Sequence, residues 1–344
     1  MKRFLVILSL VIGFYVLKTL YQAGQFKSIT NTNKGEVARV YTNMYGPEDM
    51  QVDRATGNLF ISATNRRAPL VDSPENGIYI LNLESDDNPR MLDNDFQGSF
   101  HPHGLSLFRE DSILYLFAVN HNAQGDFVES FIYQNDMLKH QKSYSYEEMC
   151  CPNDVVAIAK DKFYVTNDHG AKKGFMRVIE EYFRIPYASL FYYNGESFSE
   201  VAGPFLYANG VNVSNDGKFL YLTTTIGASL IVFERVSDGS LIERTITDLA
   251  TGVDNIDVDE NGNLWIGAHP KLLSFVKHAK DSSNMSPSQI LKLIPDDNNE
   301  FEVEEFYMND GVELSGSSVV VPYGGHIYIG GVFDRKLLKI KLND

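Results

Sequence analysis

The chain has 344 residues, of which 44% are hydrophobic and 22% charged, a composition typical of a globular protein with a large core. Its formal net charge of −15 argues against nucleic acid as a partner, because phosphate backbones are bound by basic surfaces. The 19 tyrosines, 22 phenylalanines and 26 glycines favour strands and turns over helices.

The N-terminus has the pattern of an export signal. Met1-Lys2-Arg3 is basic, and an apolar run from Phe4 to Leu17 follows it. Extended to Tyr21, the run reaches about 18 residues, the length that begins to span a membrane. Without a clear small-residue cleavage site, we expect residues 1–22 to be an uncleaved signal anchor or transmembrane segment; a cleaved signal peptide is the alternative. Either way, the rest of the chain is expected to be extracytoplasmic (periplasmic, extracellular or lumenal).

A short strand-like run recurs six times along the remaining chain. Each copy is centred on an aromatic residue, and these residues are Phe60, Tyr115, Tyr164, Tyr221, Trp265 and Tyr328. Successive members of this set are 44 to 63 residues apart, which fits propeller blades of about 40–50 residues with loop insertions. We therefore predict an all-β fold, a six-bladed β-propeller over residues 23–344.

A second polar pattern precedes each aromatic anchor by about 11–13 residues. Its members are Glu48-Asp49, His103, Asn153-Asp154, Asn209, Asp254-Asn255, and Ser315 with Ser317. Each leads into a strand-like run, which would be the first strand of its blade. Because the first strands of all blades line the central channel, these side chains are expected to meet on the axis.

Three further stretches stand outside the repeat. Residues 171–189 are typical of an amphipathic helix at the channel mouth, which either packs on the propeller or walls a substrate pocket; its apolar face comprises Phe175, Val178, Ile179, Tyr182 and Phe183. Residues 277–299 are predicted to be a loop. Cys150 and Cys151 are adjacent and are expected to be free thiols, because a disulfide between neighbours is strained.

Carboxylate and carboxamide oxygens without thiolates suit a hard cation such as calcium. The candidate ligands of one ion are Glu48, Asn153, Asn209, Asp254 and Asn255. Asp49 and Asp154 point the opposite way along their strands. They are therefore candidates for a second ion, together with a backbone carbonyl near Leu105.

Histidines accompany this set. His103 occupies an axial position itself, His121 follows a neighbouring strand, and His269 trails the fifth repeat. A neutral imidazole beside a cation that polarises a carbonyl would take a proton from water. This is the chemistry of ester or lactone hydrolysis.

These motifs resemble the paraoxonase/arylesterase family. The resemblance runs through the whole chain in order and is carried by residues 46–49, 101–106, 119–121, 152–157, 163–169, 208–214, 253–256 and 264–270. It implies a six-bladed propeller with two calcium ions and a lactonase with promiscuous aryl esterase activity. It also implies an N-terminal helix that associates with membranes.

The resemblance also implies roles for individual residues. The catalytic calcium would be held by Glu48, Asn153, Asn209, Asp254 and Asn255, and the structural calcium by Asp49, Asp154 and the carbonyl of Leu105. His103 and His121 would form a catalytic dyad, with Asp168, His169 and His269 in the pocket. The chain departs from the family in one respect, because it lacks the cysteines that would join its two ends. We expect residues 36–41 to close the ring by pairing with residues 336–342.

The expected partners are therefore a small-molecule lactone or ester and, through the N-terminal segment, a membrane. Long-chain acyl lactones are favoured by the apolar helix at the channel mouth. Two alternatives stay open. One is a sugar lactonase resembling gluconolactonase or regucalcin, with a single metal ion. The other is a non-catalytic propeller that binds a partner on its top face and uses calcium only for stability.

Overall fold

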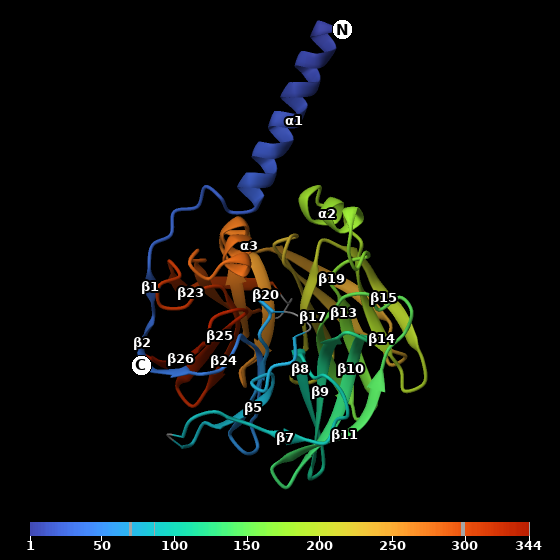
Figure 1. Cartoon of the computed structure of the whole chain (residues 1–344), viewed down its shortest axis with the longest axis vertical. Helices are drawn as coiled ribbons and strands as arrows, with labels where there is room; N and C mark the ends of the chain where they lie inside the picture. The colour runs from blue at the N-terminus through green and yellow to red at the C-terminus, as the bar shows by residue number, and fades with distance from the viewer. Residues whose placement is uncertain (69–70, 86, 297–299, 344) are drawn as a thin grey trace.

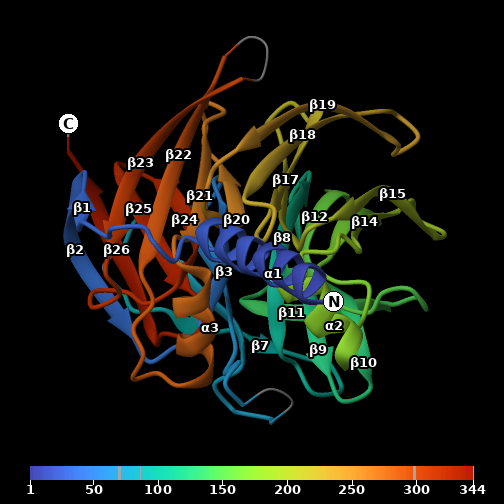
Figure 2. The same cartoon turned by 90° about the horizontal axis from the view of Figure 1, so that it is seen from above.

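The computed structural model describes residues 1–68, 71–85, 87–296 and 300–343. In this part of the chain, six β-sheets are arranged around a central axis (Figures 1 and 2). Each sheet has an innermost strand, and the chain then moves outward through antiparallel neighbours. The predicted six-bladed propeller is confirmed.

The blades follow one another along the chain, and each extends outward from its innermost strand. The first blade comprises β3 (Pro47–Asp53), β4 (Asn58–Ala63), β5 (Gly77–Asn82) and β6 (Arg90–Met91). The second comprises β8 (Pro102–Glu110), β9 (Ile113–Asn122), β10 (Gly125–Gln134), β11 (Met137–Tyr144) and β7 (Asp93–Asn94). The third comprises β12 (Pro152–Ala159), β13 (Lys162–Asn167), β14 (Ala188–Tyr193) and β15 (Phe198–Phe205). The fourth blade comprises β16 (Ala208–Val213), β17 (Phe219–Thr224), β18 (Ser229–Arg235) and β19 (Leu241–Asp248). The fifth comprises β20 (Gly252–Val258), β21 (Leu264–His269), β22 (Ser288–Pro295), β23 (Phe301–Asn309) and β1 (Thr32–Asn33). The sixth comprises β24 (Ser317–Tyr323), β25 (His326–Gly331), β26 (Lys336–Leu342) and β2 (Gly35–Thr42).

The hydrophobic core is divided into six clusters, each between two neighbouring blades. The six aromatic residues of the sequence repeat all lie in the second strand of their blades. Phe60, Tyr164 and Tyr328 are among the largest fully buried side chains. The repeat therefore records interblade packing, and the axis of the ring is left free for polar side chains.

The two ends of the propeller chain close the ring by strand pairing. β2 is antiparallel to β26, from Gly35 opposite Leu342 to Thr42 opposite Lys336. This confirms the expected closure without a disulfide, and both cysteines of the chain are free. β1 extends the neighbouring fifth blade by pairing with β23.

Three helices lie at one face of the propeller (Figure 1): α1 (Lys2–Gln22), α2 (Phe175–Tyr182) and α3 (Leu272–Lys280). α1 projects away from the blades and is exposed along almost its whole length. Its mean hydropathy of 2.1 and its 21 residues make it long and apolar enough to cross a membrane, a test that signal sequences also pass.

Two sequence predictions about this face need correction. The helix expected over residues 171–189 covers only α2, because Gly174 has a left-handed backbone (φ 89°) before it and Pro186 follows it. Most of its apolar face points to solvent, whereas the acidic Glu180 is buried. Residues 277–299 are not simply a loop, because they contain the end of α3 and all of β22; residues 297–299 lie outside the described part.

Candidate active site

All six inner strands are irregular at their polar position. In β3, for example, the pairing with β4 passes from Pro47 to Asp49 and leaves Glu48 outside the ladder. Equivalent interruptions leave unpaired residues 103–104, 153–154, 209–210, 254–255 and 318. Bulges of this kind re-aim side chains and are frequent beside active sites. Here they turn polar groups of six blades toward one axis.

The sixth blade differs from its prediction. Ser318 is the residue at the irregularity, and its hydroxyl donates a hydrogen bond to the Glu48 carbonyl (2.7 Å). The Ser317 hydroxyl bonds to the backbone carbonyls of Ala268 and Gln289, both 3.2 Å away. Ser315 donates to another backbone carbonyl, that of Ser286. The sequence pattern placed the axial residues of the sixth blade at Ser315 and Ser317, whereas the structure places Ser318 there, three and one residues further along the chain.

The blades come into direct contact at these positions. A Cβ atom on Gly104 would lie 2.5 Å from Asp154 Cα and 2.6 Å from the Asn153 carbonyl oxygen, so only glycine fits between β8 and β12. Asn255 Nδ2 donates to both the carbonyl and Oε1 of Glu48, at 3.0 Å each. Side chains separated by about 200 residues in sequence are thus neighbours on the axis.

Three of the five candidate ligands of the catalytic ion carry a buried oxygen without a hydrogen-bond partner. These oxygens are Oδ1 of Asn153, Asn209 and Asn255. An unsatisfied buried acceptor costs about 1–3 kcal/mol, so three of them need an explanation. The amide nitrogens of Asn209 and Asn255 do have acceptors, at Thr225 and Glu48, which turns the oxygens the other way.

The two remaining candidates of this set are buried acids with different environments. Burial opposes the charge of Glu48, but His103 and Arg66 nearby lower its pKa to about 2. Burial raises the pKa of Asp254, although a 2.8 Å contact with His269 Nε2 opposes the shift. Glu48 is therefore charged at neutral pH, whereas desolvation disfavours the charged form of Asp254.

Asp49 and Asp154 form a second buried acidic pair. Burial raises the pKa of both well above the usual range, and repulsion from neighbouring acids adds to the effect. Their oxygens accept backbone N–H bonds across the blades, from Leu105 to Asp49 (2.6 Å) and from Val211 to Asp154 (2.7 Å). Leu105 therefore contributes its N–H group to this pair; the expected coordination by its carbonyl stays a prediction.

The donor chemistry fits hard cations. Within the described residues, no three or more His, Cys, Asp or Glu side chains are arranged as a metal group. The set instead depends on carboxamide oxygens supplemented by Glu48 and Asp254. Unpartnered oxygens beside excess buried acid are what an oxygen-liganded cation such as calcium would satisfy.

A histidine pair adjoins the acidic cluster. His103 Nδ1 lies 3.0 Å from His121 Nε2, and His103 Nε2 lies 3.5 Å from Glu48 Oε1. His121 Nδ1 in turn lies 2.8 Å from Asp126 Oδ1, and Lys172 caps the other oxygen of this acid. Desolvation lowers the pKa of His121, which keeps it neutral at neutral pH.

Asp168 and His169 lie beside α2. Asp168 Oδ1 is 2.6 Å from His169 Nδ1, and Glu181 of α2 is 3.3 Å from Nε2. Burial opposes the charged imidazole, but these two acids raise its pKa to about 9. Arg177, also on α2, contacts Glu181 at 3.2 Å. The charged His169 therefore fastens α2 to the rim of the channel.

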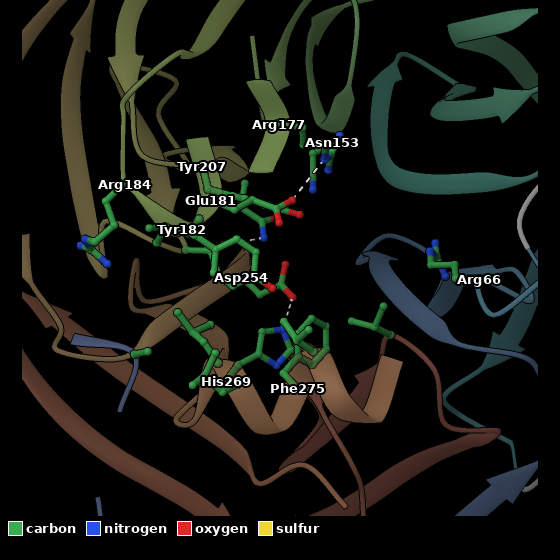
Figure 3. Close-up of a pocket in the computed structure, with 18 of the residues that line it drawn as sticks. Arg66, Asn153, Arg177, Glu181, Tyr182, Arg184, Tyr207, Asp254, His269 and Phe275 are labelled. Carbon is green, nitrogen blue, oxygen red and sulfur yellow. Dashed lines mark hydrogen bonds and ion pairs between the residues drawn. The ribbon is translucent and has the colours of Figure 1, made fainter. Parts of the chain in front are cut away.

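A cavity of about 320 Å³ opens above the cluster (Figure 3). Its polar floor contains Glu48, Arg66, His103, Asn153, Asn209, Asp254 and His269. Its walls are largely apolar and include Ile226, Leu272, Leu273, Phe275, Val276, Val332 and Phe333. Thr19 and Ala23 place the base of α1 at its edge, and α2 and α3 contribute opposite sides. The cavity therefore suits a molecule with a polar head and an apolar body.

The structure adds residues that the sequence patterns missed. Arg66 reaches over Glu48 at 3.4 Å, and Asp126 supports His121. Arg177, Glu181 and Tyr207 line the cavity. None belongs to the six-fold repeat, so the periodicity carried no signal for them.

The fold and the site define a β-propeller hydrolase, with an acid and amide cluster and a histidine pair on its axis. The sequence profile of the arylesterase family matches residues 54–340. Human serum paraoxonase/arylesterase 1 is 32% identical over 305 residues, 85% of each chain. The rat protein of that name is 29% identical over 97% of each chain. The chain belongs to the arylesterase family, and the expected ester hydrolase class is confirmed.

Solved structures share the fold at much lower identity. A calcium-binding protein, regucalcin, from Agrobacterium tumefaciens matches with a TM-score of 0.56 at 12% identity, covering 90% of this chain and 93% of its own. A periplasmic gluconolactonase from Pseudomonas aeruginosa matches with a TM-score of 0.53 at 14% identity, covering 86% and 89%. These similarities support the propeller fold alone.

Proposed function

We propose that this protein is a calcium-dependent hydrolase that opens lactones and also cleaves aryl esters. The observation that carries the proposal is the set of three unpartnered amide oxygens beside Glu48 and Asp254, next to the His103–His121 pair. Family membership supports ester hydrolysis, and the acid and amide cluster supports the cation.

The residues proposed to hold the catalytic calcium are Glu48, Asn153, Asn209, Asp254 and Asn255. A bound calcium ion would polarise the ester carbonyl and stabilise the negative charge that develops on its oxygen. Neutral amide ligands would leave the ion with much of its charge. Asp49 and Asp154, with Leu105, are proposed to hold a second, structural calcium, because Asp154 and Glu48 repel Asp49 and because Glu48 and Asp254 repel Asp154, and a cation would relieve this repulsion.

His103 is proposed as the general base. With the Nδ1 proton of His121 donated to Asp126, the Nε2 atom of His121 accepts the Nδ1 proton of His103. His103 Nε2, which lies 3.5 Å from Glu48 Oε1, is then the nitrogen with the free lone pair, and it is proposed to take a proton from water in the cavity that His103 lines. Asp126 stabilises the positive charge that develops on the pair, as an orienting acid does in a catalytic triad. His269 lines the cavity and acts through Asp254, whereas Asp168 and His169 are proposed to act on the pocket through the position of α2.

The substrate is proposed to be a lactone with an apolar substituent. The polar floor of the cavity would face the ring ester, and the walls from α3 and the sixth blade would cover the apolar part. We also propose that α1 anchors the domain in or on a membrane outside the cytoplasm. Tyr15 of α1 stacks on Phe183, just after α2, and donates a hydrogen bond to its carbonyl. The anchor and the cavity mouth therefore share one face.

One alternative is a one-metal sugar lactonase. It is disfavoured by the second acidic pair, Asp49 and Asp154, which a one-metal site does not need. A non-catalytic propeller is disfavoured by family membership and by the histidine pair on the axis.

The test is a panel of δ-lactones with alkyl substituents of increasing length, together with phenyl acetate and gluconolactone. We expect the purified protein with calcium to hydrolyse the lactones, with kcat/KM rising with alkyl length, and to hydrolyse phenyl acetate more slowly. Preference for gluconolactone would support the sugar lactonase instead. No turnover of any compound would contradict the proposed function.

A further inference from the structure

The two cysteines of the chain lie together at the rim of the candidate active site. The Sγ atoms of Cys150 and Cys151 are 2.7 Å apart, and the chain has no other cysteine. Both residues line a second cavity, of about 430 Å³, which also contains His103 and His121. This cavity shares His103 and Arg177 with the proposed substrate cavity, so the thiols face the same channel mouth.

The sulfur atoms have polar neighbours. Cys150 Sγ donates a hydrogen bond to the His169 carbonyl at 3.1 Å and accepts one from Asn167 Nδ2 at 3.8 Å. Cys151 Sγ accepts a hydrogen bond from Arg177 Nη1 at 3.7 Å. Cys151 is buried, whereas Cys150 is partly exposed. Cys150 is therefore the thiol that a small reagent reaches first, and Cys151 lies directly behind it.

We propose that Cys150 and Cys151 act together as one modification site, which disulfides of the glutathione class reversibly convert into a vicinal disulfide. Cys150 attacks the reagent and forms a mixed disulfide, which releases the first glutathione. Cys151 then attacks the Cys150 sulfur and releases the second glutathione. The two thiol protons pass to the two released thiols, and the two electrons lost by the cysteines reduce the reagent.

Because the two cysteines are neighbours in sequence, the second step should be fast and the resulting disulfide should be easily reduced. Neighbouring Cα atoms are about 3.8 Å apart, below the roughly 4.4–6.8 Å usual for disulfides. The closed ring is therefore strained and easily reduced, as in regulatory disulfides. In the mixed disulfide, the second thiol is held beside its target, so ring closure outcompetes a second glutathione.

Ring closure also changes the wall of the cavity. It removes the S–H group that donates to the His169 carbonyl, and it alters the sulfur that faces Arg177. Both partners belong to the charged contact that fastens α2 to the channel rim. We expect the oxidised protein to bind substrate more weakly; this expected effect on substrate rests on the proposed function.

Intact-mass measurement tests the modification directly. Wild-type protein treated with glutathione disulfide should lose the mass of two hydrogen atoms and regain it with dithiothreitol. The matched variant Cys151→Ser should stop at an adduct with one glutathione. Wild-type protein that keeps a glutathione adduct, or stays unmodified under conditions that modify Cys151→Ser, would contradict the proposal.

Phenylarsine oxide gives a test that needs no substitution. The reduced pair should bind one arsenical per chain as a cyclic dithioarsinite, releasing one water molecule, and the oxidised form should bind none. Failure of the reduced protein to bind would contradict the paired site even if the cysteine variants do not fold.

Kinetics on one lactone complete the experiment. The oxidised protein should show a severalfold higher KM with kcat little changed, and dithiothreitol should reverse the effect. Equal KM values for both forms would contradict the coupling to substrate. If neither form hydrolyses any ester, the proposed function has failed, and the mass and arsenical results still decide the modification site.

Discussion

The two ends of the propeller channel treat buried charge in opposite ways. At the end away from the helices, Asp53 pairs with Arg109 through contacts of 3.2 and 2.5 Å. Arg54 approaches Asp257 at 3.3 Å, although burial still raises the pKa of this acid to about 7. At the helical end, Arg66 pairs with Glu48 at 3.4 Å, but no arginine or lysine in the described part of the chain forms an ion pair with Asp49, Asp154 or Asp254.

This difference shows what the helical end is for. At one end, partly exposed arginines lie against the buried acids and balance part of their charge without a ligand. The other end keeps acids and unpartnered amide oxygens together, which costs folding free energy in the isolated chain. A protein accepts such a cost where function needs it, and here a cation would remove it. Substitutions at each end in turn would show whether the two ends differ in this way.

The largest effect is expected from His103→Gln at the helical end. Removing the proposed base should lower kcat on a lactone by about 10²–10⁴-fold. Calcium content and melting temperature should change little. His326→Gln, on β25 and outside the cavity, is the matched control and should keep full activity. A kcat within a few-fold of wild type for His103→Gln would mean that another group is the base.

At the opposite end, Arg109→Leu should destabilise the fold without a direct effect on chemistry. It leaves the buried Asp53 without its arginine, a loss of about 1–3 kcal/mol in the free energy of unfolding. Calcium should not restore this loss selectively. The control is Lys160→Leu, which removes an exposed pair with Glu110 and should leave the free energy of unfolding close to that of the wild type. Equal losses in urea unfolding would erase the contrast between the two ends.

Asp126→Asn should have a smaller effect on turnover. It weakens a charge-assisted hydrogen bond to His121, worth about 1.5–3 kcal/mol, so kcat should fall about 10- to 150-fold. KM should stay near the wild-type value, and the pH profile of kcat should shift. Asp216→Asn, an exposed acid paired with Lys218, serves as control. An unchanged pH profile would reduce Asp126 to a structural role.

The smallest expected effect is the change of the free energy of unfolding with pH. Burial raises the pKa of Asp49, Asp154 and Asp254, so the folded state holds more protons than the unfolded state above pH about 4. The free energy of unfolding of chelated protein should therefore fall as pH rises from about 4 through these raised values. Calcium should flatten this dependence. Asp257 also has a raised pKa, but its contribution should be the same in the chelated and the calcium-bound protein, so the difference between the two pH profiles reports Asp49, Asp154 and Asp254. Identical pH profiles with and without calcium would contradict the proposal that these three acids bind the ions.

The sequence predicted the propeller because a strand repeat is a local pattern that recurs. The aromatic anchors and the axial positions Glu48, Asn153 and Asn209 follow from it directly. The bulges that turn these side chains inward have no such signature, and for this reason Ser318 was missed in favour of its neighbours. Asp126 and Arg66 were missed because loops and outer strands bring them to the axis, and their positions depend on tertiary packing.

Local propensity also misled in two places. The apolar residues around α2 predicted one helix over residues 171–189, but Gly174 and Pro186 confine it, and most of its apolar face is exposed. The loop expected over residues 277–299 was based on its polar ends. Its middle, Ser288 to Pro295, is a short run rich in isoleucine and leucine and forms β22 within the fifth blade.

The central claim is that the acid and amide cluster works only with a bound cation. The direct measurement is hydrolysis of one δ-lactone by chelator-treated, dialysed protein as calcium is added back, with melting temperature followed in the same samples. We predict no turnover at first, and then a rise of both quantities to saturation. At about a thousandfold excess over its Kd, one ion should contribute about 4 kcal/mol of stability. Full turnover by the calcium-free protein would contradict the account.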